Sequence, residues 1–442
     1  MIIGLSLAYC AYTRGLPLTI RSALTPLIGR FANGLFGHII DILAVIATIL
    51  GVSVTIGFSV SQLVDGVFAI TNWGWLMDRT GDTPVATKTG LITSLVVIMG
   101  MSIISACSGV GRGVKYLSNL NLVLSMVLLL TFIMIGSLMF AMTTFASSLI
   151  DYILHFAQMS FGAYGPLAAD AFATNAPAAV QALGAEQQAA VYSAATNAWG
   201  SSAGFATALT ETGITLSAED AAAYGAGEQG RQFGWQAGWT TFYWAWWIAF
   251  SPFIGLFLVR ISKGRTVREF VLGAVIAPAL VCFAWMAILG GTAIDLEING
   301  AANGTIIAAS NSAKLFVTLE QMLSGGLLQA LIIMCVVLIM TFLVTSADSG
   351  ILVMNTIISG GAEETGMLHR IVWGVILTLV IGTLLVAGGG GLSDLQNAMI
   401  ICALPFTMMM VAKVIALIKA MYNDGRRERS GDAPEAAAQP AE

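Results

Sequence analysis

Trp239-Thr-Thr-Phe-Tyr-Trp-Ala-Trp-Trp-Ile-Ala-Phe-Ser-Pro-Phe253 is the most informative stretch of this sequence. It contains no Lys, Arg, Asp or Glu, and it lies in an apolar run that extends over residues 238–260. A helix needs about 20 apolar residues to cross the hydrocarbon core of a bilayer. The run is therefore predicted to form a membrane-spanning helix.

The composition of the whole chain supports a membrane location. Of 442 residues, 57% are hydrophobic and only 10% are charged, with a mean hydropathy of +0.85. Soluble domains carry about 25% charged residues, so this chain cannot cover its surface in water. We predict an all-α integral membrane protein. The small net charge of −5 argues against a nucleic-acid partner.

Seven further stretches are long and apolar enough to cross the membrane, which makes eight full spans. The first of the eight along the chain, at residues 39–70, is long for one crossing and is expected to be tilted or broken around Gly51 and Gly57. Met1–Tyr12 would cover only ~18 Å as a helix, so it is interpreted as the C-terminal half of a span. The further full spans are predicted at 39–70, 87–108, 118–143, 267–292, 326–346, 369–388 and 394–420.

The distribution of Lys and Arg predicts the orientation of these spans. If residues 13–37 are cytoplasmic, only Arg79, Lys88, Arg231 and Lys314 lie outside, and the other 15 of the 19 Lys and Arg lie inside. Such a bias is typical of cytoplasmic loops. The sequence thus predicts a multi-pass protein of a bacterial-type inner (plasma) membrane with a cytoplasmic C-terminus.

Two segments are predicted to lie outside the bilayer core. Residues 145–236 form a long external connection, and its amphipathic start at Asp151–Met159 is expected to lie along the membrane surface. Residues 423–442 are charged and rich in Ala and Pro, so they are predicted to be a disordered cytoplasmic tail. Residues 1–422 would then be the membrane domain.

The aromatic stretch itself has two interpretations. Trp235 and Trp239 fit an interfacial aromatic belt. In a helix, Trp247 would lie ~12 Å beyond Trp239, below the depth of the headgroups. It would stand beside the face that Trp246, Phe250 and Phe253 share. Aromatic faces at that depth suit a ligand cation that cannot donate hydrogen bonds, a quaternary ammonium. Ordinary packing of aromatic side chains is the alternative.

A second group of residues could bind a small cation. Phe342-Leu-Val-Thr-Ser-Ala-Asp-Ser349 ends an apolar helix with hydroxyls and a carboxylate, which are costly in lipid and typical of a site. Thr345 and Ser346 are candidate oxygen ligands for Na⁺. The alternative is a helix end at the interface, where Asp348 is hydrated. Thr48 is a weaker candidate, because a lone Thr in a helix usually bonds to its own backbone.

The cysteines and histidines predict no resident metal, disulfide or cofactor. The cysteines lie in or beside apolar stretches without Cys-x-x-Cys spacing, and the histidines are far apart. No set of Ser, His and Asp, or of Cys and His, has a spacing suited to catalysis. We therefore do not expect an enzyme.

Several stretches resemble the betaine/carnitine/choline transporter family over nearly the whole chain. The tryptophan-rich stretch and the basic stretch that follows it are highly specific together. The matching stretches are Gly15-Leu-Pro-Leu-Thr-Ile-Arg-Ser-Ala-Leu24, Gly113-Val-Lys-Tyr-Leu-Ser-Asn-Leu-Asn121, Phe242-Tyr-Trp-Ala-Trp-Trp-Ile248, Arg260-Ile-Ser-Lys-Gly-Arg-Thr-Val-Arg-Glu-Phe270 and Thr345-Ser-Ala-Asp-Ser349.

The resemblance implies a helix bundle with the inverted repeat of the leucine-transporter type, sodium coupling and a homotrimer. It places Trp246, Trp247 and Phe250 in a box for the trimethylammonium group, with Trp244 on the outer approach. The implied substrates are compatible solutes such as glycine betaine, choline or carnitine. For Na⁺ it implies one site with Phe342, Thr345 and Ser346, and another with Thr48 and Phe253.

The sequence also departs from the family pattern. Phe250 stands where the family usually has Trp, and Val52 where sodium-coupled members can carry a second Thr, which would weaken that second site. The family's first three helices and most of the fourth have no counterpart before Met1. An N-terminally truncated symporter is the first interpretation. A membrane remnant that does not transport and a sodium-independent substrate/product antiporter are the alternatives, although the basic side chain typical of sodium-independent members is absent.

Overall fold

The computed structural model describes residues 2–80, 84–108, 113–162, 169–176, 178–197, 209–215, 217, 235–300, 302–362, 365–386 and 392–430. The chain divides into two compact units. One unit comprises Met1–Ile150 with Trp246–Glu442, and the other comprises Asp151–Ala245.

The first unit is a bundle of long helices. Its only described sheet is a two-residue antiparallel hairpin of β1 (Met77–Asp78) and β2 (Val85–Ala86). Short helical turns lie at Tyr9–Thr13, Ile20–Leu24, Gly29–Asn33, Leu272–Ile276 and Met286–Gly290, and a further one, Gln236–Thr241, belongs to the second unit. The α-helices are α1 (Ile2–Ala8), α2 (Thr25–Ile28), α3 (Leu35–Thr71), α4 (Lys88–Ser108), α5 (Gly113–Ile135), α6 (Leu138–Leu154), α14 (Phe242–Ile261), α15 (Val267–Val271), α16 (Ala277–Trp285), α17 (Gly291–Ile298), α18 (Thr305–Ala308), α19 (Lys314–Met322), α20 (Gly325–Ile358), α21 (Met367–Val386) and α22 (Leu392–Ser430).

Eight helices in the described part of the chain are long and apolar enough to cross a membrane, which confirms the predicted all-α, multi-spanning class. They cover Leu35–Thr71, Lys88–Cys107, Tyr116–Ile135, Gly238–Arg260, Val267–Ile298, Gly325–Ile358, Met367–Val386 and Leu392–Arg427. Residues Ile2–Thr13 form a shorter apolar helix, as their length predicts.

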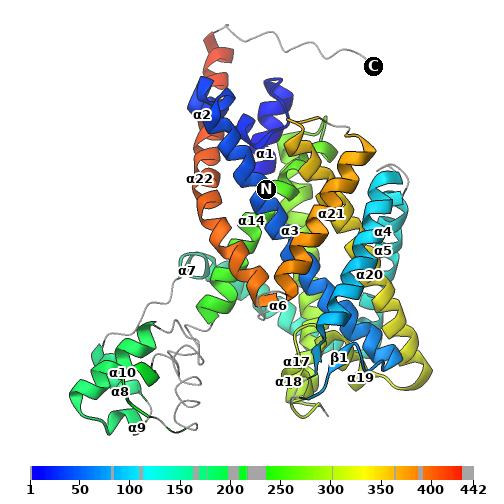
Figure 1. The fold of residues 1–442 in the computed structure, drawn as a ribbon, viewed down its shortest axis with the longest axis vertical. Coiled ribbons are helices and arrows are strands. Elements are labelled where there is room, and N and C mark those ends of the chain that lie inside the picture. Colours follow the sequence, from blue (N-terminus) through cyan, green and yellow to red (C-terminus); the bar gives the residue numbers. More distant parts are fainter. Residues whose placement is uncertain are drawn as a thin grey trace. The chain divides into compact units, whose positions relative to one another are not determined.

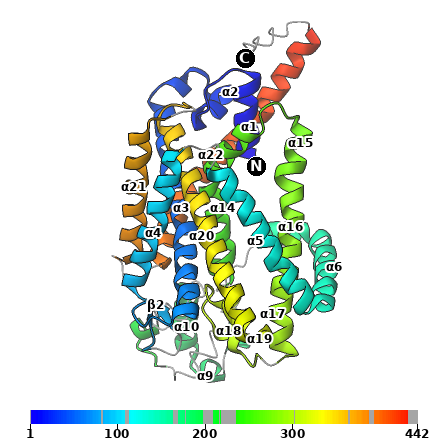
Figure 2. The same cartoon turned by 90° about the vertical axis from the view of Figure 1, so that its right-hand side faces the viewer.

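Helix α3 is the element around which the first unit is built. It packs against α20 and α22, and both views of the ribbon show it in blue in the middle of the bundle (Figures 1 and 2). Of the two predicted alternatives, a tilt or a break around Gly51 and Gly57, the break is wrong, because α3 is one continuous helix. The two glycines instead allow close packing. A Cβ at Gly51 would lie 2.9 Å from the backbone nitrogen of Phe250, and one at Gly57 would lie 2.9 Å from a methyl group of Leu395 on α22.

The predicted span 118–143 is wrong at its C-terminal end. Helix α5 ends at Ile135, and α6 is a separate helix. A Cβ at Gly136 would lie 2.4 Å from the carbonyl oxygen of Phe132, so only glycine permits this turn. Beyond it, the hydroxyl of Ser137 donates a hydrogen bond to Asp295 on α17. The turn therefore ties the start of α6 to a different spanning helix.

Two further predicted helix ends need correction. Helix α20 does not stop at residue 346 but continues to Ile358, so Asp348 lies inside the helix and is not a hydrated helix end. Helix α22 continues to Ser430, so the predicted tail from 423 is helical over its first residues. Residues 431–442 lie outside the described residues. Pro252 does not interrupt α14, although a π-helical turn at Gln236–Thr241 precedes this helix.

Polar contacts hold the ends of several helices together at one end of the bundle. The loop after α20 meets the N-terminal segment there, since a Cβ at Gly361 would lie 2.8 Å from the backbone nitrogen of Leu18. These ends are the ones predicted to be cytoplasmic, so the alternation of spans agrees with the structure, while the side they face stays a prediction. The arginine contacts at this end join Arg14 with Asp424 (2.8 Å), Arg260 with Thr356 (2.6 Å), and Arg370 with the carbonyl oxygen of Ala106 (2.8 Å).

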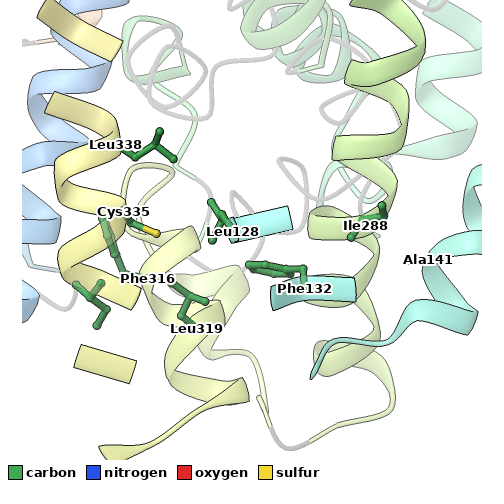
Figure 3. Packing of buried hydrophobic residues seen from close by; sticks show 9 residues of the cluster. Leu128, Phe132, Ala141, Ile288, Phe316, Leu319, Cys335 and Leu338 are labelled. Atoms are coloured by element: carbon green, nitrogen blue, oxygen red, sulfur yellow. The ribbon is translucent and has the colours of Figure 1, made fainter. Parts of the chain in front are cut away.

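A hydrophobic cluster packs near the opposite end, where α5, α19 and α20 meet (Figure 3). Phe316 and Leu319 of α19 are buried in this cluster, and the cluster also packs against the first half of α20. The buried members are Leu128, Phe132, Ala141, Ile288, Phe316, Leu319, Ile332, Cys335 and Leu338.

The second unit contains α7 (Phe156–Phe161), α8 (Ala169–Asn175), α9 (Ala178–Gln181) and α10 (Ala185–Asn197). Helices α8 to α10 have a small apolar core of their own, centred on Val180, Val191 and Ala195. The predicted amphipathic start at Asp151 is helical, divided between the end of α6 and α7. Its location on the membrane surface stays a prediction.

The close approach at Gly51 predicts the effect of one added methyl group. We expect Gly51→Ala to lower the stability of the detergent-solubilised protein by about 1–3 kcal/mol, because the methyl group would overlap the α14 backbone. Thermal unfolding followed by size-exclusion chromatography would measure the change. Gly100→Ala on α4 is the matched control, since no atom lies within 4 Å of its Cβ position. Equal unfolding temperatures for the two variants would contradict the prediction.

Candidate functional site

Four predicted aromatic residues form one row along α14. Trp246 and Trp247 have ring centroids 6.3 Å apart, and Trp247 meets the edge of Phe250 at the same separation. Phe250 in turn packs against Phe253 with centroids 4.9 Å apart. Within this row Trp247 is 63% exposed, whereas Phe253 at its end is buried. Trp244, the predicted outer residue, is also exposed.

A separate stack of rings precedes this row. Trp239 stacks on Trp235 and on Tyr243, with centroid separations of 5.4 Å and 5.6 Å. All three rings are exposed. An exposed stack at the start of a span fits the interfacial belt predicted for Trp235 and Trp239.

Two close helix contacts determine where α14 lies. On one side it meets α3 at Gly51, and on the other it meets α1, where a Cβ at Gly255 would lie 3.1 Å from the backbone nitrogen of Gly4. Glycine at a helix crossing lets two backbones approach, as in many membrane helix pairs. The aromatic row is therefore carried by a helix whose backbone is in contact on two sides.

The contacts between α3 and α14 define an antiparallel register. Gly51 lies against Phe250, and Thr55, one turn later on α3, contacts Trp246, one turn earlier on α14. One turn in the other direction from Gly51 and Phe250 lie Thr48 on α3 and Phe253 on α14, both of which are buried. That these two residues form one cation site, as the resemblance implies, stays a prediction.

Sequence reasoning missed two residues at this crossing. The indole nitrogen of Trp246 donates a hydrogen bond to the Thr55 hydroxyl at 3.3 Å, and the ring of Phe58 lies 5.7 Å from that of Trp246. The signal available in the sequence was the unusual number of hydroxyl side chains within an apolar span. Among them are Thr48, Ser53, Thr55, Ser59 and Ser61.

Two of the hydroxyls proposed as cation ligands, those of Thr345 and Thr48, donate to carbonyl oxygens of their own helices. Thr345 donates to the carbonyl oxygens of Phe342 and Thr341 at 2.9 Å and 3.2 Å, and the buried Thr48 donates to Ala44 at 2.7 Å. A hydroxyl oxygen has two lone pairs in addition to its proton, so each can still accept a cation. The chemistry therefore fits oxygen ligation.

Other members of the two proposed Na⁺ sites fit oxygen ligation of a cation less well. Ser346 is half-buried beside Thr345, but the Phe342 ring is 47% exposed. Val52 packs against α20, since a Cβ at Gly350 would lie 3.1 Å from its methyl group. An apolar side chain thus occupies the space where a second hydroxyl would strengthen the set of Thr48 and Phe253.

Next to the α20 hydroxyls lie two polar contacts between helices. Asp348 is 2% exposed and accepts a hydrogen bond of 2.7 Å from Ser105 on α4. Thr341, one turn before Thr345, donates a bond of 2.5 Å to Asn121 on α5. Polar groups in a membrane interior are costly unless they are paired. Both pairs hold α20 at the turns that carry the candidate ligands.

Within the part of the chain that the structure describes, no three His, Cys, Asp or Glu side chains group as a site for a metal ion.

Comparison with known proteins gives a consistent result. The model of the betaine/carnitine/choline transporter family matches residues 1–175 and 199–426. A glycine betaine/proline/choline transporter of Vibrio parahaemolyticus is 32% identical over 425 residues, covering 96% of this chain and 62% of the relative. A glycine betaine transporter of Bacillus subtilis is 30% identical over 437 residues, covering 98% of this chain and 69% of that protein.

The matches cover only part of each relative, and the family match leaves out one segment of this chain. An uncharacterised transporter of Haemophilus influenzae is 32% identical, and the match covers 96% of this chain but 52% of the relative. The chain thus spans about half to about two thirds of the length of these relatives. Residues 176–198, which hold α9 and α10, lie outside the family match.

The extent of the match confirms the resemblance and the expectation that the chain is not an enzyme, because the members of this family are transporters. The spanning helices and the family together make it a multi-pass membrane protein. The chain belongs to the betaine/carnitine/choline family of transporters.

Proposed function

We propose that this chain takes part in secondary active transport of quaternary-ammonium solutes. The observation that supports this most is the row of Trp246, Trp247 and Phe250 near the middle of the span Gly238–Arg260. A quaternary ammonium has no hydrogen to donate, so aromatic faces away from water bind it better than polar groups do. Trp247 offers the most open face of the row and is proposed as the main contact.

Glycine betaine is the proposed first substrate. Relatives from Vibrio parahaemolyticus and Bacillus subtilis are named as glycine betaine transporters, and one of them also for proline and choline. Choline and carnitine carry the same trimethylammonium group and would meet the same rings. Trp244 is proposed to lie on the approach to the site, because it is exposed about a turn before Trp247.

We propose sodium as the coupling ion. Thr345 and Ser346 on α20, with the backbone of Phe342, form one proposed site, and Thr48 with Phe253 form a weaker one, as the family resemblance implies. Helix α3 carries no Lys or Arg in the sequence, so it offers no fixed cation in place of Na⁺. This favours a symporter over a sodium-independent antiporter.

The remaining proposals concern location and assembly. The bias of Lys and Arg supports a plasma membrane location with the C-terminus in the cytoplasm. A homotrimer is proposed from the family resemblance. The exposed apolar residues of α6, including Met139, Met142 and Ile150, would face lipid or a second copy.

Uptake of labelled glycine betaine tests the proposed function. We expect a transport-deficient bacterial strain that expresses this chain to take up the solute. Trp247→Ala should raise the KM about five- to thirtyfold, the range for loss of one cation–π contact. The KM of Trp247→Phe should lie between those of the wild type and Trp247→Ala, because phenylalanine keeps an aromatic face. Trp239→Ala is the control from the exposed stack and should leave the KM unchanged.

No uptake of glycine betaine, choline or carnitine by protein shown to be in the membrane would refute the proposal for this chain. It would favour the alternative of a membrane protein that folds without transporting. If Trp247→Ala takes up the solute as the wild type does, the transport proposal stands, but the assignment of Trp247 as the main substrate contact is refuted.

The sodium dependence of uptake tests the proposed coupling ion. With Na⁺ replaced by K⁺, uptake should fall to background. Thr345→Ala and Ser346→Ala should each raise the Na⁺ concentration for half-maximal uptake about tenfold or more, since each removes an oxygen that contacts a charge. Thr378→Val on α21 is the control, because that hydroxyl also donates to its own helix, at 2.7 Å. Equal uptake in Na⁺ and K⁺ would instead favour the sodium-independent antiporter.

A further inference from the structure

Trp246 is held by contacts from a different helix. Its indole nitrogen donates to the Thr55 hydroxyl at 3.3 Å, and that hydroxyl donates its own proton to the carbonyl oxygen of Gly51 at 3.2 Å. A Thr hydroxyl has one proton and two lone pairs, so both bonds can form at once. An indole N–H needs an acceptor when it is removed from water, and α3 supplies one.

A second contact from α3 acts on the face of the same ring. Phe58 lies 5.7 Å from Trp246 between centroids, with the planes inclined by 31°. Thr55 and Phe58 are three residues apart, so they share a face of α3. One holds the polar edge of the indole and the other packs against its face. Together they oppose rotation of the ring about both side-chain torsions.

The backbone of α3 makes this arrangement possible. Gly51 brings α3 into contact with α14 at Phe250, one turn from Trp246. The same glycine accepts the Thr55 bond through its carbonyl oxygen. The position of Trp246 is therefore determined by the crossing of α3 and α14, whereas Trp247, its neighbour in the row, is mostly exposed.

We propose that Thr55 and Phe58 are positioning residues that set the ring plane of Trp246 and thereby the preference for fully methylated ammonium groups. This rests on the proposed function of the aromatic row. A fixed aromatic wall is favourable for a cation that fills the space beside it with methyl groups. A ring free to rotate would also accept smaller ammonium groups that donate hydrogen bonds, so discrimination would fall.

Transport kinetics provide one readout. Thr55→Val keeps the shape of the side chain but cannot accept from the indole. We expect it to raise the KM for glycine betaine about three- to tenfold, as for loss of one hydrogen bond, with Vmax within about twofold. The KM for dimethylglycine should change less, so the preference between the two solutes falls. Thr55→Ser keeps the hydroxyl and should restore the wild-type values, and Phe58→Leu should act like Thr55→Val.

Ser61→Ala is the matched control for these variants. It removes another α3 hydroxyl, whose bond of 3.1 Å goes only to its own helix carbonyl at Gly57. We expect no change in the preference between solutes. A Thr55→Val protein with the wild-type preference would overturn the proposed effect on specificity.

Ring positioning can be measured without transport. Hydroxyl-radical footprinting with mass spectrometry reports the oxidation of Trp246 relative to Trp247 in purified protein. We expect Thr55→Val to raise this ratio about two- to threefold, and Thr55→Ser and Ser61→Ala to leave it unchanged. An unchanged ratio in Thr55→Val would refute the positioning role even if the wild-type chain transports. A raised ratio in a chain that takes up no solute would confirm the positioning and refute the proposed function.

Discussion

The arrangement of this protein depends on the crossing of α3 and α14 at Gly51. The absence of a side chain at that position lets the two backbones meet beside Phe250. One turn away, Thr55 of α3 accepts a hydrogen bond from Trp246 of α14. The aromatic row on α14 takes its position from this contact.

Paired polar groups between helices are the second constraint, and they follow from the cost of burying such groups in lipid. Asp348 with Ser105 joins α20 to α4, and Thr341 with Asn121 joins it to α5. Arg260 with Thr356 joins α14 to the far end of α20. Helix α20 is thus held at successive turns on either side of Thr345 and Ser346. A site for a small cation requires such support, because its ligands must be held at fixed distances.

Much of the candidate site was predictable because its residues are close in sequence and helical spacing is regular. Trp246, Phe250 and Phe253 share a face at any helical geometry near 3.6 residues per turn, and the structure shows them with Trp247 in one row. Thr55 and Phe58 were not predictable in the same way. They are far from Trp246 in sequence, and nothing local indicates which helix they meet. The break between α5 and α6 was missed because apolar residues continue on both sides of Gly136.

By itself the sequence determined the class of the protein, the eight spans in the part of the chain that the structure describes, and the residues of the aromatic row. These features depend on hydrophobicity and on the short-range geometry of a helix, both of which are local. Only the tertiary structure decided that Gly51 is a contact and not a break, that Asp348 is buried against Ser105, and that α3 holds Trp246. The physical reason is that each of these depends on which helix lies opposite. A glycine or a hydroxyl in a span has the same local pattern whether it kinks its helix, bonds to its own backbone or contacts a neighbour.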